Sequence, residues 1–192
     1  DEIAAIGLLI FKPADLFKSR RFRKEGKYLS ARVIKPFIPS RSVRYRLTLE
    51  RITSSIFNAF KSGKSHIEGI SDAVIANGVS SGALQVSDAY APVSEADVVV
   101  IAVPTPLNER GSADLSLLIS ATKSLGEVLK SPKLIINEST SYPGTLREVI
   151  KPLIDGGSGQ SHLYSISPER VDPGNRSYGV KNTPRVVGGL SD

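Results

Sequence analysis

The chain has 192 residues, of which 40% are hydrophobic and 23% charged, a composition typical of a globular domain. It contains no cysteine, which excludes disulfides, thiolate metal sites and a cysteine nucleophile among these residues. No run approaches the roughly 18 apolar residues needed to cross a bilayer, and no signal-peptide pattern opens the chain, so we expect a cytoplasmic protein without a membrane partner.

The positive charge is concentrated in the first quarter of the chain. Residues 1–51 hold 13 Lys and Arg against 5 Asp and Glu, whereas residues 52–192 hold 12 against 14. The basic segment has no RNA-binding signature, no zinc ligands and no basic helix leading into heptads. We therefore expect no nucleic-acid partner; a nucleic-acid-binding protein, the alternative, would lose affinity steeply with salt.

Strand patterns alternate with helix patterns from residue 83 onward. Strands are predicted at residues 83–87, 97–103, 133–137, 162–166 and 185–187. One helix is predicted after Asp114, its N-cap, and a second from about residue 144, while the glycine-rich residues 156–159 are predicted to form a flexible connector. This alternation predicts an α/β fold with a parallel, Rossmann-like sheet and helices on both faces.

The strand at residues 97–103 is the most informative element. Its six consecutive apolar residues, 98–103, indicate a strand covered on both faces, and it stops at Pro104 because proline has no N–H for a neighbouring strand. The loops that follow the strands ending near residues 103, 137 and 166 should converge, because carboxyl ends of parallel strands share one edge of the sheet. Their hydroxyl groups suit phosphates and riboses, and Glu169 is a candidate general base.

Other kinds of site find little support. Residues 61–65 (KSGKS) lack the first glycine of a phosphate-binding P-loop, since Asn58 stands there. The only histidines are His66 and His162, and no Gly-x-Ser-x-Gly elbow accompanies them. We expect His162 to be a strand or loop histidine with a satisfied ring, and no metal site.

Several segments together resemble the UDP-glucose/GDP-mannose dehydrogenase family, and within it the UDP-N-acetyl-hexosamine 6-dehydrogenases. The matching pieces are residues 63–68 (GKSHIE), 96–107 (ADVVVIAVPTPL), 114–116 (DLS), 138–145 (ESTSYPGT), 167–175 (SPERVDPGN) and 184–189 (PRVVGG). The resemblance implies an NAD-dependent enzyme that oxidises the C6 alcohol of a UDP-sugar to a uronic acid. It also implies a homo-oligomer for the full-length protein.

The resemblance implies roles for individual residues. Those expected to surround NAD are Val103, Pro104, Thr105, Pro106, Leu107, Ser139, Thr140 and Ser141, with the last three near the nicotinamide. Thr140 would also position a catalytic water, and Glu169 would be the acid/base that assists hydrolysis of a covalent thioester. Those expected to border the sugar nucleotide are Glu169, Arg170, Val171 and Asp172.

The chain departs from the family at its beginning. The Gly-x-Gly-x-x-Gly turn keeps only Gly7, a predicted cofactor contact, because Leu9 and Lys12 occupy the other two places and their Cβ atoms obstruct a pyrophosphate. We interpret residues 1–51 as a degraded first part of the Rossmann unit, with residues 8–50 altered by a reading-frame error or by true divergence. A better glycine-rich match in another frame of the encoding nucleotides would support the frame error.

The second departure concerns the catalytic cysteine. Relatives continue into a second domain that carries this cysteine, so we expect residues 52–192 to be an NAD-binding domain truncated before its substrate domain and inactive alone. The alternative is a non-catalytic nucleotide-binding or assembly module that has lost cofactor binding.

Overall fold

The computed structural model describes residues 45–48, 54–65, 70–170, 175, 177–178 and 183–190. The predictions for Gly7, residues 8–44, His66, Val171 and Asp172 lie outside these ranges. Among the described residues, no helix is both long and apolar enough to traverse a bilayer.

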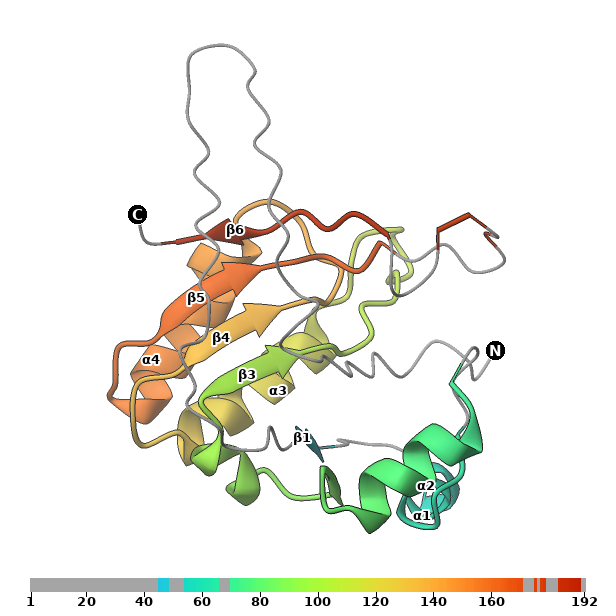
Figure 1. Ribbon diagram of the computed structural model, residues 1–192. Helices are drawn as coiled ribbons and strands as arrows, with labels where there is room; N and C mark the ends of the chain where they lie inside the picture. Colours follow the sequence, from blue (N-terminus) through green and yellow to red (C-terminus); the bar gives the residue numbers. More distant parts are fainter. Residues whose placement is uncertain are drawn as a thin grey trace.

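The strands form two sheets (Figure 1). In the smaller sheet, β1 (Tyr45–Thr48) pairs in parallel with β2 (Leu84–Ser87). The larger sheet has the order β3-β4-β5-β6, formed by β3 (Val98–Ile101), β4 (Leu134–Asn137), β5 (Leu163–Ile166) and β6 (Gly188–Gly189). Strands β3, β4 and β5 are parallel, and β6 joins the edge antiparallel to β5.

Helices or helical turns separate successive strands from β1 to β5, as the alternating pattern predicts. In chain order they are α1 (Ser54–Lys61), α2 (Asp72–Ser80), the 3-10 turn η1 (Ala91–Glu95), α3 (Ser116–Val128), the π-helical turn η2 (Leu146–Ile150) and α4 (Lys151–Ser158). The N-cap of α3 is Leu115, one residue after the predicted Asp114, whose carboxylate still accepts a hydrogen bond from the Ser116 N–H at 2.8 Å. The Rossmann-like α/β fold is thus confirmed.

Helices α3 and α4 lie side by side on one face of the larger sheet (Figure 1). Alternate strand residues point into this layer, so Val99, Ile135 and Tyr164 are buried. On the opposite face Val98 is 48% exposed and Leu163 57% exposed. Strand residues were predicted to be buried on both faces of the sheet, and this prediction holds for one face only. No described helix contributes to the hydrophobic core from the other face.

Of two glycine-containing segments, one agrees with its prediction and the other does not. Gly63, with φ of 77°, ends α1, and its N–H donates to the Phe60 carbonyl at 3.0 Å. The segment 61–65 is therefore a helix C-terminus, which agrees with the rejection of a P-loop. The prediction of a flexible connector at residues 156–159 is wrong, because α4 continues to Ser158 and Gly157 packs on Gly126 of α3.

The predicted strand at residues 185–187 is displaced. Pairing begins only at Gly188, which lies opposite Ile166 of β5. Arg185 precedes the strand, and its guanidinium reaches carboxylates in the loops beyond β4 and β5.

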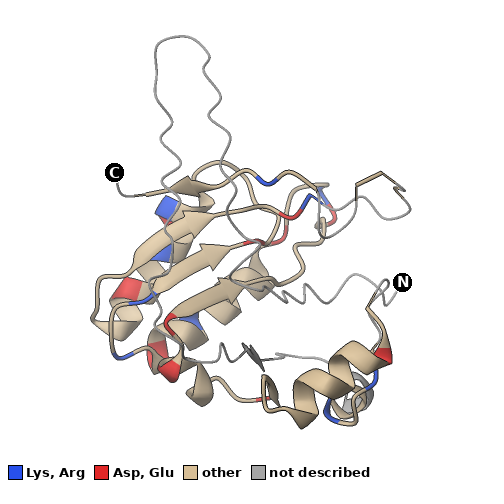
Figure 2. Ribbon diagram, viewed as in Figure 1, with Lys and Arg blue, Asp and Glu red and all other residues tan. Residues whose placement is uncertain are grey.

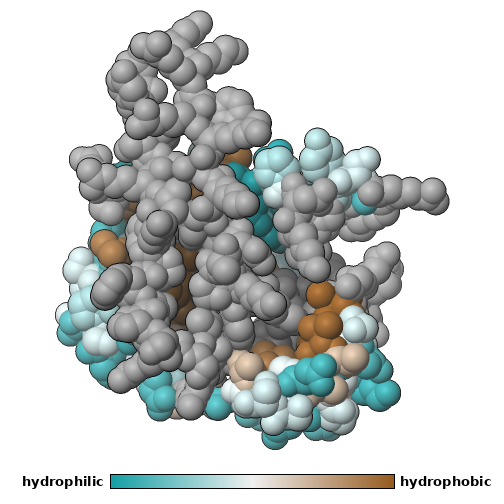
Figure 3. Space-filling model, viewed as in Figure 1, coloured by the Kyte–Doolittle hydropathy of each residue, from teal (hydrophilic) through white to brown (hydrophobic). Residues whose placement is uncertain are grey.

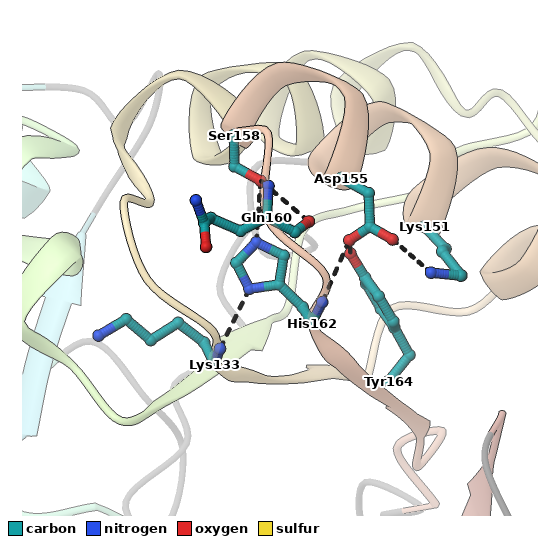
Figure 4. A network of polar contacts seen from close by, with 7 residues as sticks. All are labelled: Lys133, Lys151, Asp155, Ser158, Gln160, His162 and Tyr164. Carbon is teal, nitrogen blue, oxygen red and sulfur yellow. Dashed lines mark hydrogen bonds and ion pairs between the residues drawn. The ribbon is translucent and has the colours of Figure 1, made fainter.

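A polar network ties the amino ends of β4 and β5 to α4 (Figure 4). Asp155 accepts hydrogen bonds from the Tyr164 hydroxyl at 2.6 Å and from Lys151. The Nδ1 atom of His162 accepts from the Lys133 N–H at 3.1 Å, and its Nε2 lies 3.0 Å from the Ser158 hydroxyl. Since Nδ1 is an acceptor, Nε2 carries the proton, and the ring is satisfied as predicted.

Candidate functional site

The loops that follow β3 and β4 are joined at the carboxyl edge of the larger sheet. The Glu138 N–H donates to the Ile101 carbonyl at 2.8 Å, and the Ser139 hydroxyl accepts from the Val103 N–H at 2.8 Å. Ser139 is only 4% exposed, so this second bond is shielded from water. The two loops are therefore held as one unit.

The loop that follows β5 joins the same unit. The Ser167 N–H donates to the Asn137 carbonyl at 2.9 Å, and the Glu169 N–H lies 3.4 Å from the Glu138 carbonyl oxygen. The predicted convergence of three loops is thus confirmed, and we call residues 103–107, 138–145 and 167–170 together the rim. In Figure 2 acidic and basic residues adjoin at the rim beyond β4 and β5, and in Figure 3 the described surface there is largely hydrophilic.

The first rim loop offers few backbone donors. The Val103 N–H is used by Ser139, and Pro104 and Pro106 have no N–H. Thr105 is half-buried, and no described residue bonds to its hydroxyl. This loop can therefore contact a ring or a ribose, whereas it cannot cradle a pyrophosphate through main-chain N–H groups.

Leu107 stands apart from the rest of this loop. It is 72% exposed and pairs with Ala113 at the base of a hairpin that projects from the rim. The hairpin is closed by a hydrogen bond from the Asn108 N–H to the Ser112 carbonyl at 2.8 Å. Of the five predicted NAD contacts in this loop, Pro106 and Leu107 are exposed and the other three are half-buried.

Asn137 organises the second rim loop and was not singled out from the sequence. Its side chain is fully buried, and its Nδ2 donates to the Ser139 carbonyl at 3.1 Å and to the Ser141 hydroxyl at 3.3 Å. These bonds fold the loop so that Thr140 between them is exposed. No described residue bonds to the Thr140 hydroxyl, which leaves it available to a ligand or water.

Glu138 is the buried carboxylate of the rim, and it was also missed. Glu138 is 5% exposed, whereas the Glu169 side chain is 43% exposed. Burial raises the pKa of Glu138 to about 7; Arg185 opposes this effect and Glu169 adds to it. A carboxyl placed directly after a strand gives no sequence signal that it will be buried.

Arg185 bridges the two carboxylates. Its Nη1 donates to Glu138 at 3.2 Å and its Nη2 donates to Glu169 at 3.0 Å. The other Glu169 oxygen accepts from the Arg170 N–H at 2.6 Å, so the carboxylate is fixed on both sides. Arg170 itself is exposed beside it.

A cavity of about 410 Å³ opens beside the second rim loop. Its walls come from Ser141, Tyr142, Ile166, Gly188 and Leu190, among others. This volume suits part of a nucleotide, such as one ring with its ribose. Together with the free hydroxyls of Thr105 and Thr140, the cavity makes the rim chemically compatible with the ribose and ring portions of a dinucleotide.

Comparisons with known proteins point to one family. The model of the NAD binding domain of the UDP-glucose/GDP-mannose dehydrogenase family matches residues 51–192. UDP-N-acetyl-D-glucosamine 6-dehydrogenase of Pseudomonas aeruginosa is 35% identical over 101 residues, which are 50% of this chain and 24% of that protein. UDP-N-acetyl-D-mannosamine dehydrogenase of Pyrococcus horikoshii is 32% identical over 145 residues, 73% of this chain and 34% of that protein.

Solved structures of such enzymes share the fold. The UDP-D-ManNAc dehydrogenase structure from Pyrococcus horikoshii has a TM-score of 0.65 at 30% identity, covering 76% of this chain and 35% of that one. Cap5O of Staphylococcus aureus, a UDP-N-acetyl-mannosamine dehydrogenase, also has a TM-score of 0.65, at 31% identity, covering 78% of this chain and 36% of that one. This chain spans about a quarter to a third of the length of these relatives.

Proposed function

The chain belongs to the UDP-glucose/GDP-mannose dehydrogenase family, and we propose that it binds NAD at the rim as part of a nucleotide-sugar 6-dehydrogenase. The observation that carries this proposal is the hydrogen bond between the Ser139 hydroxyl and the Val103 N–H. It joins two loops that lie where open α/β sheets bind nucleotides. The segment from Val103 to Pro106, half-buried as far as Thr105, would then lie along the adenosine side of NAD.

The second rim loop is proposed to hold the nicotinamide end. Ser139 is committed to Val103, and Ser141 to Asn137, so these two residues shape the loop. Thr140 presents its free hydroxyl to the cofactor or to a water. When bound, NAD supplies the hydride acceptor for oxidation at C6 of the sugar.

Glu169 is proposed as the acid/base beside the reacting carbon. In this role its half-exposed carboxylate would take a proton from a water held by Thr140. Arg185 and the Arg170 N–H hold this carboxylate in place, which limits the reorganisation needed for proton transfer. Arg170, Val171 and Asp172 are proposed to border the sugar nucleotide.

The proposed substrate class is a UDP-N-acetyl-hexosamine. The proposal is supported by the names of the relatives from Pseudomonas aeruginosa and Pyrococcus horikoshii, which act on UDP-N-acetyl-D-glucosamine and UDP-N-acetyl-D-mannosamine. These 192 residues contain no cysteine for a covalent thioester, so by themselves they should give no turnover of UDP-sugars, although we expect them to bind NAD.

Calorimetric titration of the chain with NAD tests the proposal. We expect saturable binding by the unmodified chain, weakened at least several-fold by Thr140→Val. Ser161→Ala, an exposed hydroxyl deletion at the amino end of β5, is the matched control and should bind as the unmodified chain does. Absence of NAD binding by a folded chain would favour a non-catalytic module instead.

A further inference from the structure

One guanidinium serves two carboxylates at the rim, and this arrangement has consequences for both. Arg185 forms an ion pair with Glu138 through Nη1 and with Glu169 through Nη2, so the two carboxylates share one cation. Arg185 is 19% exposed and Glu138 only 5%, so their interaction is weakly screened by water. A change of charge on Glu138 therefore changes the strength of the electrostatic interaction between Arg185 and Glu169.

The balance of charge in this cluster depends on one proton. With Glu138 neutral, the three side chains together carry no net charge, because the charge of Arg185 is balanced by that of Glu169. With Glu138 ionised, two carboxylates share one cation and the cluster carries a net negative charge. The charged groups that act on Glu138 are Arg185, which precedes β6, and Glu169, which follows β5.

We propose that Glu138 and Arg185 are positioning residues for Glu169: Arg185 holds the Glu169 carboxylate at the rim, and the proton on Glu138 decides how strongly Arg185 acts on it. The effect of this linkage on catalysis rests on the acid/base role proposed above for Glu169. The electrostatic linkage between the two carboxylates does not depend on that role, because it follows from the shared guanidinium.

Burial supports the existence of a proton on Glu138 near neutral pH. The pKa of Glu138 is raised from 4.5 to about 7, mainly by burial and further by Glu169. Two linked acids influence each other equally, so whatever Glu169 does to Glu138, Glu138 does to Glu169.

The test is a pH titration of the chain labelled with ¹³C at the glutamate carboxyl carbons, followed by NMR from pH 3 to 10. Glu138→Gln and Glu169→Gln assign the two signals, and both changes preserve side-chain shape. In the unmodified chain we expect the Glu138 carboxyl to titrate near 7. In Glu169→Gln the Glu138 titration should move to lower pH, because a neighbouring negative charge is lost.

The reciprocal measurement is decisive for Glu169. In the unmodified chain the Glu169 signal should show a second inflection near pH 7, where Glu138 loses its proton and begins to share Arg185, and Glu138→Gln should remove this inflection. Arg185→Gln should raise the pKa values of both carboxyls, and Arg185→Lys should restore them only in part, since one ammonium cannot reproduce the two-nitrogen fork. Glu127→Gln, which removes an exposed carboxyl of α3, is the control and should change neither titration.

Independent titrations of the two carboxyls, or a Glu138 signal that titrates near 4.5, would overturn the inference. NAD added to the same samples separates this outcome from failure of the proposed function. NAD binding without linked titrations would overturn the linkage and leave the cofactor proposal intact. Linked titrations without NAD binding would support the linkage and count against the cofactor proposal.

Discussion

Helices α3 and α4 approach so closely at Gly126 and Gly157 that adding one methyl group should separate them. A Cβ atom at Gly157 would lie 3.1 Å from the Cα and carbonyl carbon of Gly126. These are backbone atoms, which cannot turn aside as a flexible side chain can. The neighbouring Gly156 has no atom within 4 Å of the same added Cβ, which makes it a matched control in the same helix.

The expected stabilities follow from two opposing effects. Replacing a helical glycine by alanine stabilises a helix by up to about 1 kcal/mol. Overpacking a tight contact costs about 1–3 kcal/mol. Gly156→Ala should therefore raise the free energy of unfolding by about 0.5–1 kcal/mol, whereas Gly157→Ala should lower it by about 1 kcal/mol.

Urea denaturation followed by circular dichroism measures this difference. Both variants should keep the same dependence of unfolding free energy on urea concentration, since the surface exposed on unfolding is unchanged. A Gly157→Ala variant as stable as Gly156→Ala would refute the close helix contact and restore the interpretation of residues 156–159 as a connector.

Three further predictions concern the rim and the amino-end network. Ser139→Ala should destabilise the chain by about 1–3 kcal/mol in urea denaturation and weaken NAD binding in calorimetry, because it leaves the Val103 N–H without its acceptor. Because the pKa of Glu138 is raised from 4.5 to about 7, the folded chain binds more protons than the unfolded chain between these pH values, and its stability falls as the pH rises through them. Glu138→Gln should remove about 3 kcal/mol of this loss of stability, measured by denaturation at pH 4.5 and at pH 8. Burial lowers the pKa of His162 below 6.5, so its contribution has the opposite sign and stability is lost as the pH falls through this region; His162→Gln should lose less stability than the unmodified chain between pH 7 and 5.5.

The three parallel strands of the larger sheet could be predicted because each is a short, mostly apolar run. Residues 98–101, 134–137 and 163–166 pair in the order and direction that alternation with helices implies. The convergence of the rim loops follows from that parallel arrangement alone. This part of the site depends on topology, which a hydrophobic pattern specifies well.

Glycine-rich stretches were harder to interpret. A glycine can mark a loop or a close approach between helices, and the sequence around residues 156–159 does not distinguish them. Only the position of Gly126 on a different helix decides the matter. Similarly, β6 consists of two glycines, so the neighbouring valines gave a strand signal three residues too early.

The Glu138–Arg185–Glu169 cluster could not be predicted, because its members are far apart in the chain. Arg185 follows Glu138 by 47 residues and Glu169 by 16. Burial of Glu138 depends on the loops that close over it, and no local pattern encodes such a contact. The resemblance to a known family identified candidate residues with free hydroxyls, such as Thr140, whereas the residues that orient them could be found only from the structure.

The most direct test of the rim as the NAD site is an NMR titration of the ¹⁵N-labelled chain with NAD. The account predicts shifts concentrated at the main-chain amides of Val103, Thr105, Thr140 and Glu169, with little change around His162 at the opposite edge of the sheet. Shifts centred on His162, or none at saturating NAD, would contradict it.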